Sequence, residues 1–150
     1  MDNNIINAPL VTNEIIIAGC RKFASENNYS DFQAEEIAIN YSRSSDGYEL
    51  AKDLERNCSW EIDCNTVEDL DMVSNYIDTE YKIVRKKWFN DNNIQSPFPI
   101  GTEIKEGVIH DIWDHDVAYY RVKRWGETNA SRFGLIKFEN AKLKVVDNVN

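Results

Sequence analysis

Residues 91–99 read Asp-Asn-Asn-Ile-Gln-Ser-Pro-Phe-Pro, and this stretch divides the chain into two parts with different patterns. It is poor in helix-forming residues, and its two prolines interrupt regular structure because proline lacks a backbone N–H. Apolar residues recur at helical spacing before the stretch and alternate in a strand-like way after it. The sequence therefore predicts an α+β protein with an acidic helical domain over residues 1–94 and a β domain over residues 95–150.

The clearest helical pattern lies just before the division, over residues 66–91. Thr66 and Asp69 have the spacing of an N-terminal capping box, and basic residues gather in the last turn, where the helix dipole favours them. Spacings of three and four keep the apolar residues on one narrow face. These residues are Leu70, Val73, Ile77, Tyr81, Val84 and Trp88. We expect a single long helix that forms the spine of a helical bundle.

Three shorter helices are predicted upstream of this spine. Thr12 or Asn13 can cap the first, and Ser30 with Gln33 has the form of a capping box for the second. The turn at residues 44–47 precedes the third. Their apolar sides supply the rest of the bundle core.

Beyond residue 100 the sequence predicts five short strands. One lies near Ile104, and the others cover residues 108–113, 117–125, 132–139 and 142–146. Five short antiparallel strands favour a closed barrel, because closure removes the exposed edges of a small flat sheet.

The segments GTEIKEGVIHDIW (101–113), AYYRVKRWG (118–126) and GLIKFENAKLKVV (134–146) resemble an SH3-like small barrel of the Tudor or KOW kind. The resemblance covers about a third of the chain and implies a five-stranded barrel. It does not indicate which residues of this chain would form the aromatic cage of a Tudor domain. A short, acidic, asparagine-rich chain with a helical module and a small barrel is also loosely similar to accessory proteins encoded by bacteriophages.

The charge is unevenly distributed. The chain holds 26 acidic and 17 basic residues, a net charge of −9, and residues 1–94 carry all of the excess. No Lys or Arg occurs between Arg56 and Lys82. The candidate binding acids of this interval are Glu61, Asp63, Glu68, Asp69, Asp71 and Asp78. Such a surface attracts a basic partner and repels nucleic acid, although a solvated helix face explains the same residues without a partner.

A second candidate surface lies on the predicted strand over residues 117–125. Alternation places Tyr119, Arg121, Lys123 and Trp125 on one face. Three interpretations remain open for this aromatic and basic row. It packs against the helical domain, it anchors a protein interface, or it stacks with single-stranded nucleic acid.

Nothing in the sequence predicts catalysis or a metal site. The sequence holds no G-x-S-x-G, P-loop or G-x-G-x-x-G motif. Both histidines lie within residues 110–116, but strand alternation points His110 and Asp111 to opposite faces, and residues 114–116 are expected to form a solvated turn. Cys20, Cys58 and Cys64 are odd in number and form no C-x-x-C motif, so we expect buried, reduced, structural thiols. We expect no enzyme activity, cofactor or bound metal.

The N-terminal residues lack the pattern of a signal peptide, and no apolar run approaches the length of a membrane span. A cytoplasmic protein without a membrane partner is therefore expected. The favoured function is non-enzymatic binding of another protein with a basic surface. One alternative is a phage-type counter-defence inhibitor that mimics the charge of DNA. Another is a nucleic-acid-binding accessory factor that uses the barrel.

Overall fold

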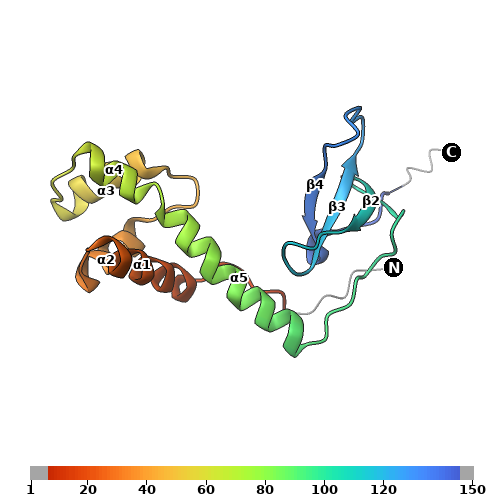
Figure 1. The fold of residues 1–150 in the computed structure, drawn as a ribbon, viewed down its shortest axis with the longest axis horizontal. Helices are drawn as coiled ribbons and strands as arrows, with labels where there is room; N and C mark the ends of the chain where they lie inside the picture. Colours follow the sequence, from red (N-terminus) through yellow and green to blue (C-terminus); the bar gives the residue numbers. More distant parts are fainter. Residues whose placement is uncertain (1–6, 146–150) are drawn as a thin grey trace. The chain divides into compact units, whose positions relative to one another are not determined.

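The computed structural model describes residues 7–145 and shows helices followed by a curled antiparallel sheet (Figure 1). This confirms the α+β class. The helices are α1 (Asn13–Asn27), α2 (Asp31–Asn40), α3 (Gly47–Cys58), α4 (Cys64–Leu70) and α5 (Val73–Asp91). The strands are β1 (Glu103–Ile104), β2 (Gly107–Ile112), β3 (Tyr119–Arg124) and β4 (Gly134–Lys137), followed by the 3₁₀ helix η1 (Phe138–Asn140).

The chain forms two compact units. The helical unit is Leu10–Val84, and the β unit comprises residues 7–9 and 85–145 of the described chain. The boundary falls within α5, between Val84 and Arg85, whereas the sequence analysis placed it between residues 94 and 95. Composition cannot reveal this division, because Trp88 continues the helical pattern but packs into the core of the β unit.

Short-range hydrogen bonds start the first three helices. The Thr12 hydroxyl accepts from the backbone N–H of Ile15, and Ser30 and Gln33 form a complete capping box. Asp46 caps α3 by accepting from the backbone N–H of Glu49 at 2.9 Å. Each cap satisfies an N–H that has no partner within its own helix. The predicted starts of these helices are confirmed.

The prediction of a single helix over residues 66–91 is wrong, because the structure has two helices there. Its first part is the separate helix α4, which Asp63 caps by accepting from the backbone N–H of Thr66 at 2.8 Å. The chain bends at Asp71 and Met72, where the Met72 N–H bonds to the Asp69 carbonyl three residues back. The Asp71 carboxylate accepts from the backbone N–H of Gly47, the first residue of α3. The bend thus coincides with a long-range hydrogen bond that periodicity does not reveal.

The core of the helical unit combines apolar residues from all five helices. Phe23 and Leu54 are fully buried in it, together with Ile77 from α5. Gly19 brings α1 very close to α5, because a Cβ added at this position would lie 2.7 Å from the Ile77 Cα. Only glycine permits this approach of two helix backbones.

The four strands are antiparallel neighbours in the order β1-β2-β3-β4. Ala118, Tyr120 and Val122 are buried, which confirms the predicted alternation along β3. The expected fifth strand is represented, within residues 7–145, by an isolated bridge between Leu143 and Ile104. The end of that expected strand, at residue 146, lies outside the described residues.

One charged side chain is completely buried in the described part of the chain. Arg85 is 0% exposed and forms a two-pronged ion pair with Glu139 of η1, at 2.5 and 2.9 Å. Its guanidinium also donates to the Ala118 carbonyl at 2.9 Å and stacks on the Trp88 and Tyr119 rings. Within the β unit, Arg85 therefore ties the last turns of α5 to η1 and to the segment before β3.

Candidate binding surfaces

The candidate acids lie on the loop between α3 and α4, on α4, in the turn between α4 and α5, and on the first half of α5. Three of them have structural hydrogen bonds that the sequence did not reveal. Asp63 caps α4, Asp69 accepts from the Tyr29 hydroxyl at 2.9 Å, and Asp71 accepts from Gly47. The bonds from Thr66 lower the pKa of the Asp63 carboxyl, because they favour its charged form.

The other three acids, Glu61, Glu68 and Asp78, are exposed. Within the described residues, none of the six candidate acids forms a salt bridge. The helical unit holds 16 acidic and six basic residues, a net charge of −10. Its negative charge is therefore largely uncompensated by neighbouring cations.

A pocket beside these acids was missed in the sequence analysis. Its volume is about 550 Å³, and it lies between the start of α2 and the loop that joins α3 to α4. Tyr29, Phe32 and Trp60 supply aromatic side chains to the lining, and Glu36 and Glu61 supply carboxylates. The available signal was Trp60, an aromatic residue directly before Glu61 in a short loop between two helices. We call this site the aromatic pocket.

A second hollow lies between α1 and α2, with a volume of about 660 Å³. Its apolar lining comes from Ile16, Ile17, Ala38 and Ile39, and Glu14 and Glu35 add carboxylates. Ile39 is 83% exposed, so this groove leaves apolar surface in contact with water.

The outer face of the sheet brings Arg121 and Lys123 together around the Phe133 ring. The two cationic groups lie 4.6 and 5.0 Å from its centroid. Arg121 also pairs with both carboxylate oxygens of Asp111, one of them at 2.7 Å, which lowers the pKa of Asp111. The Lys123 ammonium donates to the backbone carbonyls of Asn129 and Arg132. Both cations therefore have partners within the β unit.

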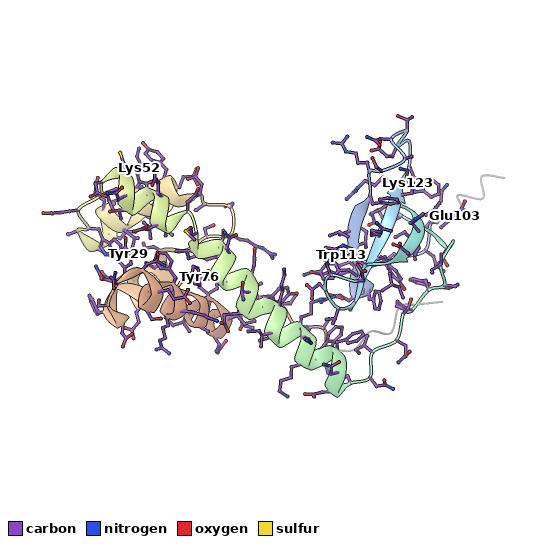
Figure 2. The ribbon with its side chains drawn as sticks, viewed as in Figure 1. Tyr29, Lys52, Tyr76, Glu103, Trp113 and Lys123 are labelled. Carbon is purple, nitrogen blue, oxygen red and sulfur yellow. The ribbon has the colours of Figure 1, made fainter. Side chains whose placement is uncertain are left out.

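Tyr119 and Trp125 lie apart from this group. The Tyr119 ring packs edge-on against Trp113 and beneath the Arg85 guanidinium. Trp125 follows the end of β3, and its indole N–H donates to the carbonyls of Ile104 and Lys105. Figure 2 shows Lys123 and Trp113 at separate places on the β unit. The four residues of the predicted row thus have three different environments.

The expectation that His110 and Asp111 point to opposite faces is wrong. The β2–β3 register shifts between Ile109 and Asp111, and the extra residue changes the alternation. As a result Asp111 pairs with Arg121, whose guanidinium lies over the Phe133 ring. The His110 ring lies 4.7 Å from the same Phe133 ring. The His115 ring lies 3.5 Å from the Asp114 carboxylate and packs edge-on against the neighbouring Trp113. In residues 7–145, no group of three or more His, Cys, Asp or Glu side chains is arranged to hold a metal ion.

The three thiols are free but differ in exposure. Cys20 is buried and Cys58 half-buried, whereas Cys64 is exposed, so the expectation of buried thiols is wrong for Cys64. Burial raises the pKa of Cys20 to about 12, and hydrogen bonding to Glu36 raises the pKa of Cys58. A raised pKa leaves less of the reactive thiolate at a given pH.

We therefore expect a thiol reagent at pH 8 to modify Cys64 first, Cys58 more slowly and Cys20 only after unfolding. Time-resolved labelling with mass spectrometry of the peptides measures this order. Cys64→Ser is expected to remove the fast phase. Fast modification of Cys20 in the folded protein would contradict the described core.

No helix in the described range is both long and apolar enough to cross a bilayer. No protein-family model matches the chain, and neither the curated proteins nor the solved structures include a significant match.

Proposed function

We propose that the chain is a non-enzymatic binding protein whose helical unit binds a basic surface of another protein. The observation that carries this proposal is the set of six acids that form no salt bridge with any described residue, on a unit of net charge −10. Such a surface raises the local concentration of a cationic partner and speeds its association.

Contacts in the β unit support a secondary role for its cations. Arg121 is paired with Asp111, and Lys123 is bonded to loop carbonyls, so each would have to give up contacts to bind phosphate. This favours a protein partner over nucleic acid. Phe133 and the exposed Leu135 can add apolar contacts that give the partner specificity.

We also propose that the β unit is a small SH3-like barrel. Residues 142–144 support this interpretation by running beside β1. The Lys105 N–H donates to the Lys142 carbonyl at 2.9 Å, and the Lys144 N–H donates to the Glu103 carbonyl at 3.2 Å. This extra pairing covers part of an otherwise open sheet edge.

Affinity capture from an extract of the native cell, with and without nuclease, tests the proposed function. We expect a basic protein to be captured despite nuclease. A variant carrying Glu61→Gln, Glu68→Gln and Asp78→Asn is expected to lose it. The matched control carries Glu14→Gln, Glu49→Gln and Glu55→Gln, which remove the same charge from exposed positions elsewhere on the helical unit.

Capture that disappears after nuclease treatment would overturn this proposal and favour nucleic acid as the partner. Equal loss in both triple variants would show that net charge alone, rather than the 61–78 surface, is responsible. Competition between duplex DNA and this chain for the captured protein would identify the partner as a nucleic-acid-binding protein and indicate DNA mimicry.

A further inference from the structure

We propose that the aromatic pocket binds an organic cation, namely the ammonium or guanidinium group of a Lys or Arg side chain on the partner. This inference rests on the proposed function and assigns it a specific anchoring point. The volume of about 550 Å³ lies within the range of ligand sites, about 300–1,000 Å³. A flexible basic side chain with an apolar stem fits the chemistry of its lining.

A stack of three rings builds one side of the pocket. Phe23, in the core, stacks on Tyr29 with 5.4 Å between centroids, and Tyr29 stacks on Trp60 at 5.8 Å. The planes of the last two rings differ by only 11°. Trp60 is the last ring of this stack and lines the pocket, so one of its faces is turned away from Tyr29. The stack holds this face in a fixed orientation.

Two carboxylates hold the polar atoms of these rings. The Trp60 indole N–H donates to Glu36 at 3.2 Å, and the Tyr29 hydroxyl donates to Asp69 at 2.9 Å. These bonds use the two ring donors, so the pocket presents aromatic faces and negative charge rather than N–H or O–H groups from the rings. Aromatic faces carry negative electrostatic potential and attract cations.

The charge of the lining is one-sided. Glu36 and Glu61 contribute carboxylates, and no Lys or Arg lines the pocket. Neither carboxylate forms a salt bridge within the described chain. Apart from the three aromatic residues, the other lining side chains carry hydroxyl or amide groups, and they are Ser30, Gln33, Ser59 and Thr66. This combination favours a cation with an apolar stem and repels an anion.

The test uses the full chain and two probes, butylammonium for a Lys side chain and ethylguanidinium for an Arg side chain. The indole N–H resonance of Trp60, assigned with Trp60→Phe, reports occupancy in an NMR titration. We expect a saturable shift with at least one probe and a much smaller shift with uncharged 1-pentanol. Equal shifts with pentanol would overturn the proposal, because they would show an apolar cleft without charge preference.

Glu61→Gln removes one carboxylate of the pocket lining from an exposed position. It is expected to weaken probe binding by about threefold, the size of a solvent-exposed ion-pair effect. Glu55→Gln on α3 is the matched control, because it removes the same charge outside the pocket and should leave binding unchanged. Equal weakening by both variants would indicate bulk charge and overturn the site.

The same variants separate this inference from the proposed function. If butylammonium shifts Trp60 and also displaces the captured protein, the partner's side chain occupies the pocket. If it shifts Trp60 without displacing that protein, the assignment to a partner side chain is wrong. If capture depends on the acids at 61–78 but no probe shifts Trp60, the proposed function stands and the cation site is wrong.

Discussion

Replacing Arg85 with Met is expected to destabilise the β unit by about 3–5 kcal/mol, the usual effect of breaking a buried ion pair. The substitution leaves the Glu139 carboxylate without the cation that it pairs with. The Ala118 carbonyl loses the bond from the Arg85 guanidinium, which lies 2.9 Å away. The rings of Trp88 and Tyr119 also lose the guanidinium that packs on them at 5.2 and 4.9 Å.

The Ala118 backbone adds to this expected loss. Its φ of 59° is in the left-handed region, which a residue other than glycine rarely adopts. Arg85 and the Phe138 N–H both donate to the Ala118 carbonyl, so they help hold this conformation. Removing Arg85 therefore also weakens the support for a strained turn before β3.

Amide hydrogen exchange in β3 measures the Arg85 effect, because it reports the stability of the β unit separately from that of the helical unit. Lys86→Met is the control, since Lys86 is the exposed neighbour and loses the same charge. We expect Lys86→Met to leave exchange nearly unchanged. A second variant, Arg85→Met with Glu139→Leu, should recover part of the loss because no buried charge then remains. Equal effects of Arg85→Met and Lys86→Met would contradict the described burial.

Replacing Phe23 with Ala is expected to destabilise the helical unit by about 3–5 kcal/mol, as is usual for deleting a buried phenyl ring. Phe23 is 0% exposed and lies 5.4 Å from the Tyr29 ring and 5.7 Å from the Tyr76 ring. Figure 2 shows Tyr29 and Tyr76 on this unit. The cavity left by Ala removes the ring that stacks on Tyr29, and Tyr29 in turn stacks on Trp60.

Phe32→Ala provides the control, because Phe32 belongs to the same unit but is 69% exposed. Its effect on stability should stay within about 0.5 kcal/mol. Hydrogen exchange at Leu54 and Ile77 measures both variants in the helical core. If Phe23→Ala lowers stability no more than Phe32→Ala, the packing assigned to Phe23 is wrong.

Local patterns in the sequence were sufficient for the first three helices and for the alternation of β3. Thr12, Ser30 and Asp46 act on backbone groups only three residues away, so short motifs reveal their function. The alternation that buries Tyr120 and Val122 likewise depends only on the geometry of a single strand.

The predictions that were wrong concern features that depend on contacts between residues far apart in the sequence. The bend after α4 coincides with the bond from Gly47 to Asp71, which are 24 residues apart. The shift in β2 reorients Asp111, and only pairing with β3 reveals that shift. Trp60 was overlooked because its role depends on stacking with Tyr29. Tyr29 precedes α2 in the sequence, whereas Trp60 follows α3.

By itself, the sequence determined the α+β order of elements, the caps of the first three helices and the excess of negative charge in the first part of the chain. The helical pattern placed Arg85 among the basic residues at the end of the helix expected over residues 66–91. Tertiary structure alone decided that this side chain is buried against Glu139, 54 residues away. It also decided that Trp60 and Glu36 share a pocket. The physical reason is distance along the chain: caps and periodicity arise within a few residues, whereas burial and ion pairing depend on which distant segments pack together.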